Sequence, residues 1–194
     1  MFDIILASKS KVRLDILNKN NVVCSAKPSN VDEDEIKISM LKDGASPKDV
    51  SKNLAEIKAN KVSQNNLDKI VIGADSVIDL ENEIISKPKN RSEALEILRK
   101  LNGKTHFLIS SVCISKNGSM IWHYTDKAEL KMKTMTEDEL KLYLSKIEDE
   151  KLYAYNVYQI EGEGKNLFNS IKGDMDTIMG LPIKKIKEYL SNLK

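Results

Sequence analysis

Apolar and polar positions follow two different periods along this chain, and the period separates strands from helices. Runs rich in apolar, β-branched and aromatic residues predict strands at residues 3–7, 22–26, 69–80, 107–115, 120–132 and 153–160. Apolar residues at helical spacing predict helices at residues 8–18, 46–64 and 91–101, one after residue 136, a short one before residue 180 and a last one after residue 182. Strands that alternate with helices, together with one long hairpin, predict an α/β fold with a mixed sheet.

Short local signals mark the boundaries of several of these elements. Ser46-Pro47 places a capping residue and a proline at a helix start, and Asn117-Gly118 is a typical hairpin turn. The segment Thr136–Glu139 has the spacing of a capping box. The acidic run Asp32–Glu35 and the polar residues 147–151 are interpreted as loops.

Length and composition describe an ordinary globular protein. The 194 residues suit a single domain, residues 1–194, with 41% hydrophobic and 31% charged residues. No apolar stretch approaches the ~18 residues of a membrane span, and the start of the chain, with Asp3 and no basic leader, does not resemble a signal peptide. Cys24 and Cys113 lie in apolar contexts typical of buried thiols rather than of a disulfide. We therefore expect a cytoplasmic protein that does not bind membranes.

Several classes of function find no support in the sequence. The net charge of +2 and the sparse aromatic residues indicate no nucleic-acid-binding patch. His106 and His123 are isolated, without a second histidine or cysteine at ligand spacing, so a zinc site is not expected. The chain also lacks the glycine-rich phosphate loops and the nucleophile-elbow motif.

The run Val71–Ile78 is the most informative segment, because an aspartate interrupts a strongly apolar strand. A buried carboxylate without partners is costly or shifts its pKa, so Asp75 requires a lysine, a metal ion or both. A carboxylate beside a lysine is a common arrangement in metal-assisted phosphate chemistry. A helix N-cap or a structural salt bridge is an equally open interpretation.

Two lysines are candidates to accompany this aspartate. Lys87 follows the strand that bears Asp75 and precedes Pro88, which favours extended backbone, so a hairpin return would bring Lys87 near Asp75. Lys58 stands one position off the apolar stripe of its helix, which favours a solvent-exposed side chain.

The first strand-to-helix junction has the chemistry of a phosphate site. The segment Ser8–Arg13 combines free backbone N–H groups, a helix dipole, hydroxyls and cations. Arg13 is one of only three arginines in a chain with 28 lysines, which suggests that a rigid, bidentate fork is needed there. A capped helix with solvated lysines is the alternative interpretation.

Together these motifs resemble the Maf family of nucleotide pyrophosphatases over nearly the whole chain. The matching segments are Leu6–Arg13 (family LASxSPRR), Ala55–Ala59 (the helical xKA element), Gly73–Val77 (GADTVV), Ser86–Pro88 (GKP), Leu101–His106 (LSGRxH), and Gln159–Gly164 with Ile171–Pro182 (the closing signatures). Each match is short, but their order and spacing make chance a poor explanation.

The resemblance implies a fold and an activity. The expected fold is α/β, with a mixed twisted sheet, flanking helices and two lobes around a cleft, similar to the inosine triphosphate pyrophosphatases. The expected activity is hydrolysis of a nucleoside triphosphate to the monophosphate and pyrophosphate, dependent on Mg²⁺ or Mn²⁺ and usually performed by a homodimer. Because the family has also been linked to septum formation, a non-catalytic nucleotide-binding regulator of cell division is the alternative.

The resemblance also implies roles for individual residues. Asp75 would be the general base or a metal-bound carboxylate, and Glu33 would support the metal or a water. The residues that would hold the phosphates are Ser8, Arg13, Lys58 and Lys87.

Departures from the family pattern concern the choice of base. Val12 replaces the first arginine of the opening motif, and Ser76 replaces the threonine after the catalytic aspartate. Residues 151–158 differ from the family's usual loop. Glu161 stands where the pyrimidine-specific branch carries glutamine, and it is similar to the 7-methyl-GTP branch, although Val12 lacks the aromatic ring with which that branch stacks a base. We expect these three positions to affect base choice and Glu161 to favour guanine; a Glu161 that points to solvent is the alternative.

Overall fold

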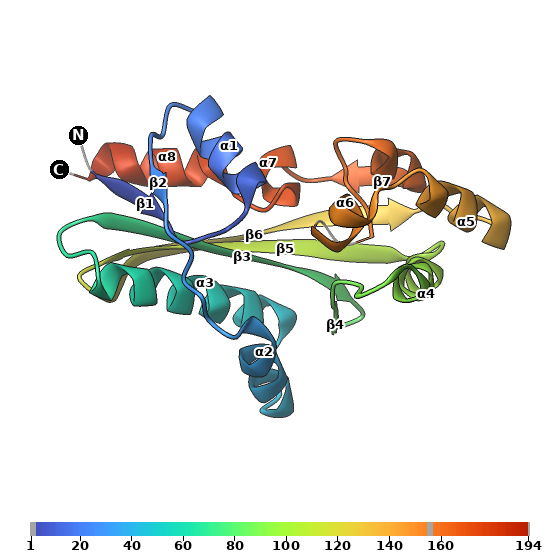
Figure 1. The fold of residues 1–194 in the computed structure, drawn as a ribbon, viewed down its shortest axis with the longest axis horizontal. Helices are drawn as coiled ribbons and strands as arrows, with labels where there is room; N and C mark the ends of the chain where they lie inside the picture. The colour runs from blue at the N-terminus through green and yellow to red at the C-terminus, as the bar shows by residue number, and fades with distance from the viewer. Residues whose placement is uncertain (1–2, 155–156, 194) are drawn as a thin grey trace. The chain divides into compact units, whose positions relative to one another are not determined.

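The computed structural model describes residues 3–154 and 157–193, which form a mixed α/β fold (Figure 1). The strands are β1 (Ile4–Leu6), β2 (Ser25–Ala26), β3 (Ile70–Leu80), β4 (Glu83–Ile85), β5 (Thr105–Lys116), β6 (Ser119–Met132) and β7 (Phe168–Lys172). The helices are α1 (Lys11–Lys19), α2 (Glu33–Lys42), α3 (Pro47–Gln64), α4 (Arg91–Leu101), α5 (Glu137–Ser145), α6 (Asp149–Ala154), α7 (Met175–Ile178), α8 (Ile183–Asn192) and the 3₁₀ helix η1 (Glu163–Leu167).

The strands of the described residues form one seven-stranded sheet. Their order is β2-β1-β3-β5-β6-β7, and β4 pairs with β3 outside this path. Strand β1 pairs in parallel with β2 and with β3, whereas β3 with β4 and β6 with β7 are antiparallel. The prediction of an α/β fold with a mixed sheet is therefore confirmed.

The chain divides into two compact units. Unit 1 comprises Met1–Val77, Ile109–Lys127 and Asp174–Lys194, and unit 2 comprises Ile78–Leu108 and Ala128–Gly173. Strands β3, β5 and β6 therefore contribute residues to both units. Within the part of the chain that the structure describes, no helix has the length and apolar character needed to span a membrane.

In unit 1 the strands carry an apolar layer on each face. Helices α1 and α8 cover one face and α3 covers the other (Figure 1). The cluster on the α1 and α8 face includes Ile4, Leu6, Ile16, Leu17, Ile70, Ile72, Ala74, Val112, Ile114, Ile183 and Ile186. The cluster on the α3 face includes Ile5, Ala7, Val62 and Val71. Because successive strand residues point to opposite faces, each residue's position along β3 decides which layer it joins.

Helix α3 lies directly against β3, because Gly73 has no side chain. A Cβ atom at Gly73 would lie 2.2 Å from the carbonyl oxygen of Ala55 and 2.7 Å from the backbone nitrogen of Ala59. Glycine inside a strand is typical of a place where another backbone approaches closely. Small residues on both elements therefore bring the backbone of α3 into contact with the strand.

The acidic run Asp32–Glu35 begins a helix, so its interpretation as a loop is wrong. Asp32 caps α2 by accepting a hydrogen bond from the backbone N–H of Glu35, and Glu33 and Asp34 occupy the first turn. Negative side chains at this end of a helix are stabilised by the helix dipole and by its free N–H groups. The charges that resembled a solvated loop are the charges that start the helix.

The predicted strand at residues 153–160 is also wrong for its described residues, and residues 155 and 156 lie outside them. Helix α6 ends at Ala154, and residues 157–160 form a turn and irregular backbone. Tyr158 is buried among other aromatic rings, so its apolar character reflects packing of a non-strand segment. Helix α6 likewise replaces most of the predicted loop at residues 147–151, and β7 was not predicted.

Unit 2 buries a histidine in an aromatic cluster. His106 is 0% exposed, and its Nε2 lies 2.9 Å from the hydroxyl oxygen of Tyr158. The rings of Tyr158 and Phe168 lie 5.6 and 5.8 Å from the His106 ring, centroid to centroid. Nδ1 of His106 has no hydrogen-bond partner among the described residues. Burial lowers the pKa of His106 to about 4, so the ring is neutral at neutral pH.

This lowered pKa predicts a pH-dependent stability. In the unfolded chain a histidine binds a proton near pH 6.5, whereas folded His106 does so only near pH 4. Between these values the unfolded state holds more protons, so the free energy of unfolding should fall as the pH falls from about 6.5 towards 4. His106→Gln, which does not titrate, should remove up to about 1.4 kcal/mol per pH unit of that slope.

Urea unfolding at a series of pH values measures the slope. His123→Gln is the control, because His123 is exposed. Identical slopes in wild type and His106→Gln would contradict the prediction.

Candidate active site

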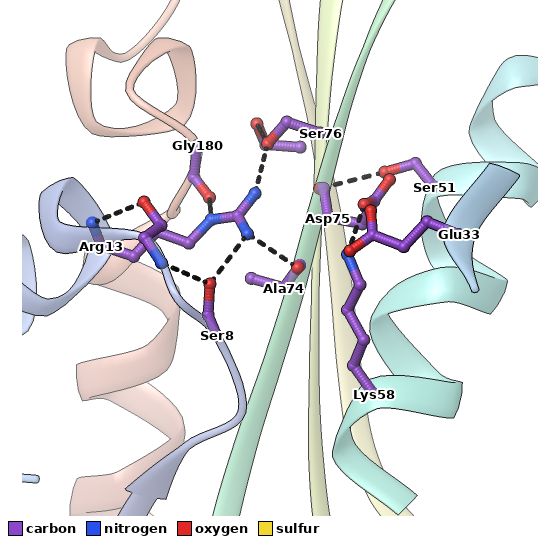
Figure 2. A network of polar contacts seen from close by, with 11 residues as sticks. Ser8, Arg13, Glu33, Ser51, Lys58, Ala74, Asp75, Ser76 and Gly180 are labelled. Carbon is purple, nitrogen blue, oxygen red and sulfur yellow. Dashed lines mark hydrogen bonds and ion pairs between the residues drawn. The ribbon is translucent and has the colours of Figure 1, made fainter. Parts of the chain in front are cut away.

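In unit 1 a buried lysine joins two carboxylates (Figure 2). The Nζ atom of Lys58 lies 2.8 Å from Oδ1 of Asp75 and 2.9 Å from Oε1 of Glu33. The side chains of Lys58 and Asp75 are 6% and 5% exposed, whereas that of Glu33 is 43% exposed. Because one lysine serves two carboxylates, the three side chains together keep a negative charge.

The contact at Gly73 explains how Lys58 reaches the strand. Asp75 lies two residues beyond Gly73 and therefore points to the same face, towards α3. Ala59, next to Lys58 in the helix, packs against Gly73. The hypothesis of a solvent-exposed Lys58 is wrong, because the small residues remove the space that would separate this part of the helix from β3. From the same helix, Ser51 donates a hydrogen bond to the Asp75 carbonyl oxygen at 3.1 Å.

One oxygen of the central carboxylate is not engaged. Oδ2 of Asp75 is buried and has no hydrogen-bond partner among the described residues, whereas Oδ1 accepts from Lys58. Of the interpretations open for Asp75, the N-cap does not apply, and the lysine partner is present. A buried acceptor without a donor is costly, so this atom is a place where a proton or a cation would bind favourably.

The surrounding charges keep Glu33 ionised. Partial burial raises its pKa, but the positive charge and hydrogen bond of Lys58, with smaller effects from Lys37 and Arg13, outweigh burial. The net result is a pKa of Glu33 below the usual value for a glutamate. Glu33 therefore carries a negative charge at neutral pH, and it is the most exposed of the three side chains.

Arg13 lies on the other side of β3 from Lys58 (Figure 2). It donates hydrogen bonds to the Ala74 carbonyl and to the Ser76 hydroxyl, which flank Asp75 along the strand. Burial lowers the pKa of the Arg13 guanidinium, while the negative charges of Asp75 and Glu33 act in the opposite direction. An arginine remains charged after such a shift.

The other residues expected at the first helix are placed on the Arg13 side. Ser10 caps α1 by accepting from the backbone N–H of Arg13, and Ser8 accepts from the backbone N–H of Ser10 at 3.1 Å. Val12 is partly buried and packs against the apolar cluster on the α1 and α8 face. The structure thus brings Ser8, Arg13 and Ser76 together, and the effect of Val12 on base choice stays a prediction.

Lys87 and Glu161 belong to unit 2. Strand β4 pairs antiparallel with β3, so the predicted hairpin before Lys87 is confirmed, and Lys87 itself is exposed. Glu161 is exposed in a turn between Gln159 and Gly162, which both line a surface pocket of about 320 Å³. Their roles towards the substrate stay predictions.

Two contributors to the site were not identified from the sequence. Gly73 allows the close approach of α3, and Ser51 holds the backbone of Asp75. Both had a signal: a glycine inside a strand indicates close backbone contact, and Ser51 lies two helical turns before Lys58 on the same face.

Comparison of the sequence with known proteins identifies the family of this chain. A family model described as Maf-like protein matches residues 3–193. The chain belongs to the Maf family.

Curated members of the family align over almost the full length of this Maf-like chain. A Pelagibacter ubique (strain HTCC1062) protein named nucleoside triphosphate pyrophosphatase is 67% identical over 99% of this chain and 98% of its own. A protein of the same name from Ruegeria sp. (strain TM1040) is 35% identical over 96% of this chain and 94% of its own. A Rhizobium etli (strain ATCC 51251 / DSM 11541 / JCM 21823 / NBRC 15573 / CFN 42) protein named 7-methyl-GTP pyrophosphatase is 37% identical over 98% of this chain and 96% of its own.

The buried ion pair predicts a large loss of stability when its lysine is replaced. Lys58→Met keeps most of the side-chain volume but leaves the Asp75 carboxylate buried without its cation, which typically costs about 3–5 kcal/mol. Lys48→Met, at an exposed position of α3, should change stability by no more than about 0.5 kcal/mol.

Urea unfolding at pH 7 measures both variants. The double variant Lys58→Met with Asp75→Asn should recover part of the loss, because it removes the unpaired charge. Wild-type stability of Lys58→Met would show that the pair is not buried as described.

Proposed function

We propose that this chain is a nucleoside triphosphate pyrophosphatase, a hydrolase that converts a nucleoside triphosphate to the monophosphate and diphosphate. The observation that carries the proposal is the buried Asp75 carboxylate, whose Oδ1 is held by Lys58 and whose Oδ2 is not engaged by the described residues. This arrangement occurs in a chain that is 67% identical to a protein named nucleoside triphosphate pyrophosphatase. A general base needs such a fixed orientation and an available acceptor atom.

The proposed reaction joins a water oxygen to the α-phosphorus and breaks the bond from that phosphorus to the diphosphate oxygen. The water must attack in line with the leaving diphosphate. Oδ2 of Asp75 would accept the proton that the water loses. Lys58 would keep the carboxylate in place through its hydrogen bond to Oδ1.

The same side chains fit a divalent cation. The residues that would hold it are Asp75 and Glu33, whose two negative charges are only partly balanced by Lys58. The described residues contain no group of three or more histidine, cysteine, aspartate or glutamate side chains that could hold a metal ion. Oxygens of the triphosphate would complete the coordination, as is common for Mg²⁺. When bound, Mg²⁺ or Mn²⁺ supplies positive charge to the non-bridging phosphate oxygens.

The phosphates would be held from two places. The Ser8 hydroxyl oxygen accepts from Ser10 and Arg13, which leaves its own hydrogen to donate to a phosphate oxygen. Lys87 would contribute a positive charge, as the resemblance to the family implies. These contacts bind charge on the substrate and fix the α-phosphorus relative to the base.

We also propose that the protein is a cytoplasmic homodimer that acts on free nucleotides and binds neither nucleic acid nor membrane. The resemblance to the family supports the dimer. The free thiols of Cys24 and Cys113 support a reducing compartment, where thiols stay unpaired.

Replacing the base tests the function directly. Asp75→Asn removes the proton acceptor and should lower kcat at least ~10²-fold, as loss of a general base typically does. Asp79→Asn is the matched control, because Asp79 is also a buried aspartate of β3 and its Oδ1 accepts from the Asn82 backbone N–H, which an amide oxygen can still do.

The assay follows diphosphate release with Mg²⁺, with Mn²⁺ and with EDTA, beside a thermal melt of each variant. EDTA should abolish turnover by the wild type, and added Mg²⁺ or Mn²⁺ should restore it. Wild-type turnover by folded Asp75→Asn would remove Asp75 from the mechanism. A wild type that releases no diphosphate from any nucleotide would favour the non-catalytic regulator.

Glu161 provides a prediction on base choice. If its carboxylate accepts from the N1–H and 2-amino groups of guanine, a uracil leaves it unpaired, and each lost charged hydrogen bond costs about 1.5–3 kcal/mol. GTP and 7-methyl-GTP should therefore give higher kcat/KM than UTP and dTTP. Glu161→Gln should reduce this preference, whereas Glu163→Gln, at a neighbouring exposed glutamate, should not. An unchanged preference in Glu161→Gln would indicate that Glu161 points to solvent.

A further inference from the structure

All three nitrogens of the Arg13 guanidinium donate to the protein itself (Figure 2). Nε donates to the Gly180 carbonyl at 2.9 Å. Nη1 donates to the Ala74 carbonyl at 2.9 Å and, more weakly, to the Ser8 hydroxyl at 3.5 Å. Nη2 donates to the Ser76 hydroxyl at 3.1 Å. The five N–H groups of an arginine are therefore largely used by four acceptors of unit 1.

The hydrogen bond to the Ala74 carbonyl lies just beyond the end of the pairing between β1 and β3. Strand β1 ends at Leu6, and the backbone N–H of Ala7 donates to the Ile72 carbonyl at 2.8 Å. Carbonyl direction alternates along a strand, so the Ala74 carbonyl points to the same side, where β1 no longer runs. Arg13 donates to this carbonyl and so takes the place of the missing strand.

A second bond starts a hydrogen-bond chain with a fixed direction. A guanidinium only donates, so the Ser76 hydroxyl oxygen accepts from Arg13. The Ser110 hydroxyl donates to the Thr177 carbonyl at 2.7 Å, because a carbonyl only accepts. The 2.8 Å contact between the hydroxyls of Ser76 and Ser110 must therefore run from Ser76 to Ser110. The hydroxyl hydrogen of Ser76 is thus used inside the protein.

The two bonds to β3 lie on either side of the proposed base. Ala74 precedes Asp75 and Ser76 follows it, while the Asp75 side chain extends from the opposite face to Lys58 (Figure 2). A displacement of the Ala74 and Ser76 backbone would move the Cα of Asp75 with it. The direction of the carboxylate therefore depends on how firmly this stretch of β3 is held.

We propose that Arg13 is a positioning residue for Asp75 and not a ligand of the triphosphate. It holds β3 on both sides of the carboxylate, and it ties that strand to the Ser8 turn and to the Gly180 backbone. The inference rests on the proposed function, because it assigns Asp75 the role of base. It differs from the role in phosphate binding that the family resemblance implies for Arg13.

Lysine cannot replace this arginine. Its ammonium group has three hydrogens on one nitrogen, whereas the acceptors of Arg13 are arranged around a planar fork with three separate nitrogens. Arg13→Lys should keep a positive charge near the site and lose most of the hold on β3. A phosphate ligand and a positioning residue therefore predict different kinetic results for the same substitution.

The experiment compares Arg13→Lys with Ser110→Ala. Ser110 is 0% exposed and donates its hydroxyl hydrogen to the Thr177 carbonyl, so it has none to offer a phosphate oxygen, and it accepts the hydrogen bond of Ser76. The controls are Arg99→Lys, at an exposed arginine of α4, and Ser115→Ala, at a buried serine of the same strand β5 that bonds to Asn60. For each protein we would measure kcat, KM, the dissociation constant of an α,β-methylene triphosphate analogue and the melting temperature.

The positioning role predicts lower kcat with intact binding. Arg13→Lys should lower kcat by about tenfold or more and Ser110→Ala by about threefold or more, while KM and analogue affinity stay within about twofold of wild type. The double variant should lose less than the product of the two effects, because both act on one hydrogen-bond chain. The two controls should match the wild type in kcat and analogue affinity.

Two results would overturn the inference. One is a loss of analogue affinity of about tenfold or more in Arg13→Lys with unchanged melting temperature, which indicates a direct phosphate contact. The other is an unchanged kcat in Ser110→Ala, and it decides the matter even if Arg13→Lys does not fold. A wild type without any turnover would instead refute the proposed function. In that case the melting temperatures still test whether Arg13 holds β3: a loss in the double variant equal to the sum of the losses in Arg13→Lys and Ser110→Ala would refute it.

Discussion

Helix α3 lies against strand β3 with no side chain between the two backbones at Gly73, and the site depends on this contact. It carries Lys58 far enough into unit 1 to meet Asp75, and it sets the Ser51 hydroxyl against the Asp75 carbonyl. A buried ion pair is worth its desolvation only when the geometry of both partners is maintained. Gly73 therefore determines whether Lys58 and Asp75 can be buried together as an ion pair.

Most of the fold could be predicted from the sequence, because local signals and burial agreed. Ser46-Pro47 marks the start of α3, and Asn117-Gly118 joins β5 to β6 with both residues at positive φ. Helix α2 is hard to predict because its apolar residues Ile36, Ile38 and Met40 alternate at a spacing of two, which is not the spacing of a helix. Residues 153–160 resemble a strand because their aromatic residues indicate burial, which a turn can also provide.

The site could be predicted only in part. Asp75 is recognisable from the sequence because an aspartate is unusual in an apolar strand, and the resemblance to the Maf family implied the other residues of the site. The apolar pattern of α3 wrongly predicts a solvent-exposed Lys58, because the exposure of this side chain depends on how closely α3 approaches β3 and not on helical periodicity alone. The hydrogen bonds of Arg13 join residues as far apart in the sequence as Ser8 and Gly180, so no local pattern contains them. Sequence shows which side chains are unusual, and the tertiary structure shows what each one bonds to.

Because side chains alternate between the two faces of β3, the site constrains the number of residues in this strand as well as their identities. Asp75 points towards Lys58 and Ser76 towards Arg13 only because they are neighbours on a strand of period two. A single residue gained or lost between the β1 pairing at Ile72 and Asp75 would exchange the two faces, placing the hydroxyl beside the lysine and the carboxylate beside the arginine. Along this stretch the number of residues is therefore constrained as strictly as the identities of Gly73, Asp75 and Ser76.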